Sequence, residues 1–216
     1  MKKITISSLL FAFSLISVLS ASANTISIPG GIGDMAYYGK EYVGPLGANL
    51  DGKVIIDGIT CLDIYSTTYV PNSGFGVTVE TLTSASLANA RFQSSDTLFK
   101  YEEAAWLNTQ LHAASNKSQI GEIQFAMWRL FTPTASSGAD KTGEDRWMNL
   151  AADAMKTPAN YDFSSVRIYT PTGSYASNQE FISGGATAAP VPEPATMLLF
   201  GTGLVSLAGM ARRKMQ

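Results

Sequence analysis

Apolar side chains recur with a helical spacing along residues 118–131, SQIGEIQFAMWRLF. One face of this predicted helix collects Ile120, Ile123, Met127, Leu130 and Phe131. At about 100° per residue, Gln124 falls inside the same arc, and Pro133 ends the helix. The pattern therefore predicts a helix that turns a primary amide toward the core.

Two more helices are predicted around this one. Asp96 can cap a helix over residues 97–112, TLFKYEEAAWLNTQLH. Thr142 and Asp145 form a Thr-x-x-Asp start for a third helix, which ends near Pro158. The residues expected to face the core are Leu98, Ala105, Trp106, Trp147, Leu150, Ala151 and Ala154.

Short segments rich in β-branched and aromatic residues predict strands on both sides of the helices. They cover residues 54–59, 60–65 and 76–82 before the helices and residues 164–171 after them. This order indicates an α+β fold, with strands flanking a helical middle. Residues 24–182 are long enough for a single domain with its own core.

The N-terminal segment has the features of a cleavable signal peptide. A basic start at Lys2 and Lys3 is followed by an apolar run over residues 9–19 and small residues at 21–23. The run is too short to be a good membrane span. We therefore expect residues 1–23 to direct export and to be removed.

The C-terminal end combines a Pro-spaced motif, an apolar run and a basic cluster. The motif is Val191, Pro192, Glu193 and Pro194, the run covers residues 195–211, and the cluster is Arg212, Arg213 and Lys214. The run reaches the lower limit for a transmembrane helix, and the basic cluster would stay on the cytoplasmic side. Residues 183–190, SGGATAAP, are expected to form a flexible linker from the domain to this tail at 191–216.

This tail resembles the PEP-CTERM sorting signal of Gram-negative bacteria that have exopolysaccharide systems. The resemblance implies that an exosortase, a membrane protease, recognises and processes the chain near residues 191–194. The implied partners are thus the exosortase and the inner membrane, in which the C-terminal helix anchors the chain transiently. The implied destination is the cell surface or an extracellular matrix such as a biofilm.

The charge and composition of the exported part exclude several functions. Residues 24–190 carry 10 basic and 16 acidic side chains, a net charge of −6. Binding to the phosphate backbone of a nucleic acid is therefore not expected. With one His and one Cys in the chain, the usual zinc clusters cannot form, and we expect no metal and no cofactor.

Cys61 is the lone cysteine and lies in the strand-like stretch DGITCLDIYSTTYVP. Exported proteins usually use cysteines in pairs, so a single one indicates a reactive thiol or intermolecular pairing. The alternative is a small buried side chain, because free Cys is among the most buried residue types.

Gln124 offers a partner for such a thiol. Burying an unpaired amide costs about 1–3 kcal/mol. The amide can avoid this cost by a hydrogen bond to a backbone carbonyl. Alternatively, the Cys61 thiolate attacks the Gln124 side-chain carbonyl and releases ammonia, which leaves an internal thioester. That reaction requires the helix to pack on the strand of Cys61.

Three short stretches, ITCLDIYSTTYVP, YEEAAWLNTQL and IQFAMWRLF, together resemble the Cys–Gln thioester domains of bacterial surface adhesins. The resemblance spans residues 37–170. It maps Cys61 to the thioester cysteine, Gln124 to its acyl partner, and Ala126 and Trp128 to the fixed positions of a Gln-x-Ala-x-Trp motif. The residues of the intervening helix that match are Tyr101, Ala105, Trp106 and Leu107.

The resemblance implies covalent attachment to a protein amine or a sugar hydroxyl, through a single acyl transfer and without enzymatic turnover. His112 could assist proton transfer or complement the dipole at the end of its helix. Two alternatives stay open. Ile123 stands where the family usually has Thr, which favours a non-covalent exopolysaccharide matrix protein without the bond. A secreted hydrolase that uses His112 has no supporting motif.

Overall fold

The structure is a computed structural model that describes residues 24–30, 35–83, 86–135, 138 and 140–189. The predicted signal peptide, sorting motif, transmembrane helix and basic tail lie outside these residues. Within the described ranges, no helix has the length and apolar character to cross a membrane.

The main sheet has seven antiparallel strands in the order β5-β4-β1-β7-β9-β10-β6. Their bounds are β1 Asn24–Ile28, β4 Asn49–Leu50, β5 Lys53–Val54, β6 Thr60–Cys61, β7 Asn72–Thr81, β9 Arg167–Pro171 and β10 Phe181–Ser183. The long strand β7 lies in the middle, between β1 and β9. Strand β6 is at one edge, where Cys61 is paired with Phe181 of β10.

Two small antiparallel pairs stand apart from this sheet. They join β2 Ala36–Tyr38 to β3 Glu41–Val43, and β8 Tyr161–Asp162 to β11 Thr187–Ala188. The described residues also contain three short 3₁₀ helices: η1 Ser86–Asn89, η2 Pro158–Asn160 and η3 Gly173–Tyr175.

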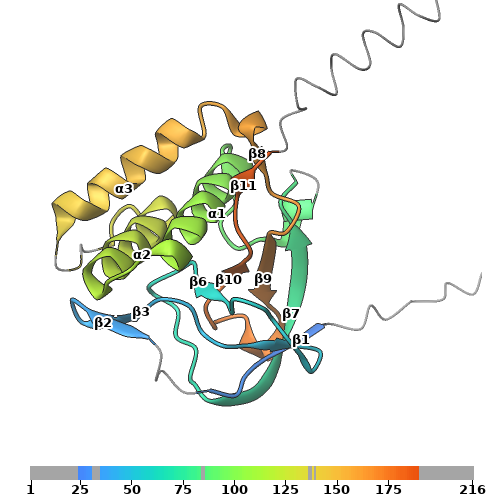
Figure 1. Ribbon diagram of the computed structural model, residues 1–216. Helices are drawn as coiled ribbons and strands as arrows, with labels where there is room; N and C mark the ends of the chain where they lie inside the picture. Colours follow the sequence, from blue (N-terminus) through green and yellow to red (C-terminus); the bar gives the residue numbers. More distant parts are fainter. Residues whose placement is uncertain (1–23, 31–34, 84–85, 136–137, 139, 190–216) are drawn as a thin grey trace, which may run out of the picture.

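The three α-helices pack against one another on one side of the sheet (Figure 1). They are α1 Thr97–Ala113, α2 Lys117–Phe131 and α3 Lys141–Ala154. Helix α1 contacts β10, and α2 contacts both β2 and β3. Helix α2 begins where the side chain of Asn116 accepts a hydrogen bond from the backbone N–H of Gln119, which satisfies one of the free donors of the first turn.

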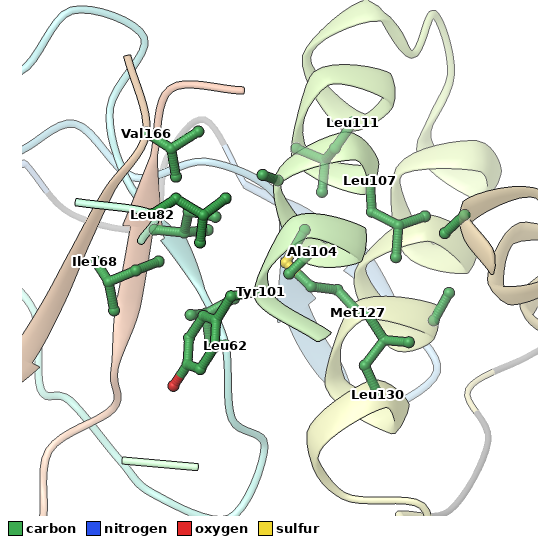
Figure 2. Packing of buried hydrophobic residues seen from close by; sticks show 14 of the residues in the cluster. Leu62, Leu82, Tyr101, Ala104, Leu107, Leu111, Met127, Leu130, Val166 and Ile168 are labelled. Carbon is green, nitrogen blue, oxygen red and sulfur yellow. The ribbon is translucent and has the colours of Figure 1, made fainter. Parts of the chain in front are cut away.

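The core consists of two clusters of buried residues. One cluster lies between the helices and the sheet, with Leu107 and Met127 on the helix side and Val166 and Ile168 on the sheet side (Figure 2). The other cluster includes Cys61 and lies among β1, β7, the β2–β3 pair and α2. Helix α2 contributes residues to both clusters, so it is buried inside the domain and packs against residues of the sheet.

The predicted α+β fold, with strands on both sides of a helical middle, is confirmed. The strands before the helices are shorter than expected. Strand β5 ends at Val54, because Asp57 and Gly58 adopt positive φ angles of 69° and 72° and turn the chain. Strand β6 ends at Cys61, since the chain bends where the Asp63 carboxylate accepts the backbone N–H of Ser66 at 2.8 Å.

Two further expectations need correction. The N-cap of α3 is Asp140 and not Thr142, because the Asp140 carboxylate accepts the backbone N–H groups of Thr142 and Gly143. The segment expected as a flexible linker begins in β10 and continues into β11. This segment is also held against α1, because the Thr109 hydroxyl donates to the backbone oxygen of Ala186 at 3.1 Å.

Candidate functional site

Helix α2 and strand β6 bring Gln124 and Cys61 together. The Gln124 side chain is 1% exposed, and its Nε2 donates to the backbone oxygen of Cys61 at 2.8 Å. Trp128, one turn further along α2, donates its indole Nε1–H to the same oxygen at 3.1 Å. The helix therefore packs on the strand of Cys61, as a Cys–Gln reaction requires.

The oxygen of the Gln124 amide also has a partner. Its Oε1 lies 3.4 Å from the backbone nitrogen of Gly44, which donates to it. Gly44 has a φ of 107° just after β3, a conformation that favours glycine. The amide group is thus held between β6 and the end of the β2–β3 pair, and its burial is compensated by hydrogen bonds.

Cys61 is a buried residue, 5% exposed. Burial, with a smaller contribution from the negative charge of Asp63, raises the pKa of the Cys61 thiol far above its usual range. The group therefore keeps its proton at neutral pH, and Sγ donates that proton to Oε1 of Gln179 at 3.4 Å.

Gln179 is a second amide beside Cys61, which the sequence did not indicate. It lies after η3, and its Nε2 donates to the backbone oxygen of Asp63 at 3.0 Å. Its backbone N–H donates to the hydroxyl of Thr68 at 3.0 Å. Because Gln179 is 118 residues from Cys61 and carries no motif, only the folded chain reveals this contact.

A pocket of about 200 Å³ opens next to these groups. Its lining residues are Met35, Glu41, Tyr42, Leu46, Cys61, Ile64, Ser66, Thr67, Thr68, Val70, Trp128 and Gln179. Cys61, Trp128 and Gln179 line the pocket, whereas Gln124 is not among its described lining residues. A molecule in the pocket would thus meet the thiol before the amide of Gln124.

A polar network fixes the chain around the pocket. Asp63 is buried and forms an ion pair with Arg91, whose Nη1 lies 2.6 Å from the carboxylate. The same guanidinium donates to the hydroxyl of Ser66 at 2.7 Å. Glu180 is fully buried and accepts the hydroxyl of Tyr101 and the backbone N–H of Arg91. These contacts hold the segment after Cys61 against the segment that carries Gln179.

The remaining residues named from the sequence lie apart from this contact. His112 is in the last turn of α1, is exposed, and does not belong to the pocket wall. Trp106 packs beside Trp147, with ring centroids 6.4 Å apart. Tyr101, Ala105, Leu107 and Ala126 are buried in the cluster between the helices and the sheet.

Among the described residues, no group of three or more His, Cys, Asp or Glu side chains is arranged to hold a metal ion. The polar groups that meet around Cys61 are its thiol, the amides of Gln124 and Gln179, and the hydroxyl groups of the pocket wall.

Comparison with known proteins identifies the C-terminal tail. Residues 190–214 match the PEP-CTERM protein-sorting motif, which confirms the resemblance stated for the tail. No curated protein matches the chain.

Among solved structures, the chain is similar to the N-terminal domain of the Streptococcus pyogenes pilus tip adhesin Cpa. The sequences are 16% identical, the TM-score is 0.37, and the match covers 78% of this chain and 93% of that chain. The motif at residues 190–214 implies an exported protein that an exosortase sorts at the membrane on its way to the cell surface.

Proposed function

We propose that this exported protein forms an internal thioester between Cys61 and Gln124 and uses it once to attach covalently to a partner. The supporting observation is the hydrogen bond of 2.8 Å from Gln124 Nε2 to the backbone oxygen of Cys61. Through this bond the Gln124 carboxamide contacts the backbone of Cys61, the residue whose thiol would attack it. The thiol of Cys61 donates to Gln179, so the reaction requires a rotation about the one heavy-atom torsion of this side chain that turns the thiol toward Gln124.

The proposed reaction is a balanced exchange. The Cys61 sulfur forms a bond to Cδ of Gln124, the bond from Cδ to Nε2 breaks, and the thiol proton leaves with the nitrogen as ammonia. A nucleophile from the partner then attacks the same carbon and releases the Cys61 thiol. Because burial raises the pKa of this thiol, release of a bare thiolate is unfavourable, and the departing sulfur takes up a proton.

Intact mass of the protein purified in its exported form tests the proposal. We expect a mass lower by one ammonia than the sequence of the processed chain requires. Cys61→Ala and Gln124→Ala should each restore the full mass relative to their own sequences. Gln119→Ala, on the same helix but half-exposed, is the matched control and should keep the deficit. A parent protein of full mass would contradict the thioester.

The second amide makes a further variant informative. Gln179 is the amide whose oxygen accepts the Cys61 thiol, so it is the competing acyl donor. If Gln124 is the partner, Gln179→Ala keeps the ammonia deficit. Loss of the deficit in Gln179→Ala together with its retention in Gln124→Ala would assign the bond to Gln179 instead.

One observation favours the alternative of a non-covalent matrix protein. Both polar atoms of the Gln124 amide have hydrogen-bond partners, which is the arrangement that an unreacted amide needs in a core. This alternative predicts one thiol that reacts with iodoacetamide after denaturation without prior treatment with an amine. The hydrolase alternative has no comparable support, since His112 is not part of the described pocket wall.

A further inference from the structure

The wall of the pocket beside Cys61 is rich in uncharged hydrogen-bonding groups. Hydroxyl groups come from Ser66, Thr67 and Thr68, and an amide comes from Gln179. Among the described lining residues, Glu41 is the one charged side chain, and it is exposed at the end of the β2–β3 turn. Groups of this kind both donate and accept hydrogen bonds, so they suit a ligand that carries many hydroxyl groups.

One exposed tyrosine lines the same opening. Tyr42 belongs to the pocket wall and is 48% exposed, and the ring of Tyr37 packs edge-on against it at 5.2 Å. Residues 64, 66–68 and 70 line another part of the wall, and Tyr65 and Tyr69, which alternate with them in the sequence, are exposed. A tyrosine ring offers a flat apolar face and a polar hydroxyl, which is the combination that the C–H faces and hydroxyl groups of a sugar ring match.

The segment that carries two of these tyrosines is held in place. The Arg91 guanidinium binds Asp63 and Ser66 at its start, and the Thr68 hydroxyl accepts the backbone N–H of Gln179. Tyr65 is directed over the end of α2, where its hydroxyl donates to the backbone oxygen of Thr134 at 3.4 Å. Binding at this surface therefore requires little ordering of the backbone, which lowers the entropic cost of association.

We propose that this surface binds a neutral polysaccharide and presents one of its hydroxyl groups to the site of Cys61. The covalent step of this inference rests on the thioester proposed above, whereas the binding step does not. In the covalent step, the sugar oxygen forms a bond to Cδ of Gln124, the bond from that carbon to the Cys61 sulfur breaks, and the hydroxyl proton passes to the sulfur. The product is an ester and a free thiol.

The charges around the pocket favour this class over two others. An anionic polysaccharide would meet Glu41 and a domain of net charge −6 over residues 24–190, without a cation among the described residues of the wall. A lysine side chain would find one exposed carboxylate, and an exposed ion pair contributes only about 0–1 kcal/mol. The uncharged hydrogen-bonding side chains of the wall outnumber this single carboxylate.

Calorimetric titration of the exported protein carrying Cys61→Ala tests binding separately from acyl transfer. The probes are neutral hexasaccharides of glucose, galactose and mannose, and a hexasaccharide of uronic acids. At least one neutral probe should bind, and the uronate should bind more weakly. Tyr42→Ala, which removes the exposed tyrosine of the pocket wall, should weaken binding about two- to tenfold. Tyr175→Ala is the matched control, since Tyr175 is 46% exposed and outside the described pocket wall, and it should leave binding unchanged.

Intact mass then tests the covalent step with Cys61 present. The bound hexasaccharide should add its whole mass, and hydroxylamine should remove it, because that reagent cleaves esters. An adduct with Nα-acetyllysine but with none of the neutral sugars, together with no neutral binding to the Cys61→Ala protein, would overturn the inference and leave the thioester standing. Neutral binding without an ammonia deficit in the parent would refute the thioester and keep the polysaccharide surface.

Discussion

Glu103 is a carboxyl group held in an unfavourable environment between helices. It is buried on α1 and lines a pocket of about 330 Å³ with Lys100, Arg129, Leu130 and Met148, among others. Burial raises the pKa of Glu103 to about 7, the charge of Asp96 adds to this effect, and Lys100 opposes it. The protonated form is therefore favoured in the folded chain.

This shift predicts a loss of stability as the pH rises. Between the ordinary pKa of 4.5 and the folded value of about 7, the folded state keeps a proton that the unfolded state has released. The free energy of unfolding therefore falls as the pH rises through this window. Glu103→Gln removes the charge, so the variant should be more stable than the parent by about 1–3 kcal/mol at pH 8.

Urea denaturation at pH 8 and at pH 4.5 measures this effect. The gain from Glu103→Gln should shrink toward zero at the lower pH, where the parent carboxyl is protonated in the folded state. Asp153→Asn, at an exposed position of α3, provides the comparison and should show no such pH-dependent gain. An equal gain at both pH values would exclude titration of Glu103 as the cause.

Residue by residue, the sequence predicted more about Gln124 than about its surroundings. Helical periodicity placed this amide in the core, and it is buried there. The same periodicity holds no information on Gln179 or Arg91, whose contacts with Cys61 and Asp63 span 118 and 28 residues. Such contacts depend on how segments distant in the chain are packed, and a local pattern does not encode that packing.

At the scale of elements, helix α2 and the β2–β3 pair are packed at very close range. A Cβ atom added to Gly121 would lie 2.0 Å from the ring of Tyr38, whereas a real Cβ contact is never this short. Because residue 121 has no side chain, α2 can lie this close to the β2–β3 pair. The same close packing lets Gln124 contact Gly44 and β6.

Gly121→Ala should therefore destabilise the fold by about 1–3 kcal/mol, because Tyr38 or the helix must shift. Gly47→Ala is the control, since a Cβ atom there meets nothing within 4 Å and its backbone is not in the left-handed region. Thermal unfolding of the two variants gives the comparison. Equal midpoints would show that the helix and the β2–β3 pair adjust without cost.

The helices were easier to predict than the strands. Helix α2 matches the expected range closely because its apolar period and Pro133 agree. The strands β5 and β6 have two residues each, since turns and side-chain contacts interrupt the β-branched runs. The start of α3 was missed because both Asp140 and Thr142 are good capping residues, and the backbone geometry selects Asp140.

At the scale of the molecule, one buried polar network joins the helical layer to the sheet. Glu180, just before β10, accepts hydrogen bonds from Tyr101 of α1 and from the hydroxyl of Thr170 in β9, the latter at 2.5 Å. Arg91 connects this carboxylate to Asp63 and so to the segment after β6. The network joins five segments of the chain, which carry Asp63, Arg91, Tyr101, Thr170 and Glu180.

Arg91→Ala should consequently cost about 3 kcal/mol of stability, because it leaves the buried carboxylate of Asp63 without its cation. Lys156→Ala removes an ion pair of similar length, 2.6 Å to Asp153, that is exposed. Its effect should stay within about 0.5 kcal/mol. Chemical denaturation of both variants measures the difference, and similar losses would show that burial of the Arg91 pair has no energetic consequence.

The position of β11 has a mechanical consequence. The chain continues from Thr187–Ala188 toward the sorting tail, so tension on that end enters the domain through a strand of two residues that is paired with β8. Antiparallel pairing at such an end opens one hydrogen bond at a time when it is pulled. Force applied at this end would therefore act on the pairing of β11 with β8 before it acts on β10 and on the sheet that holds Cys61.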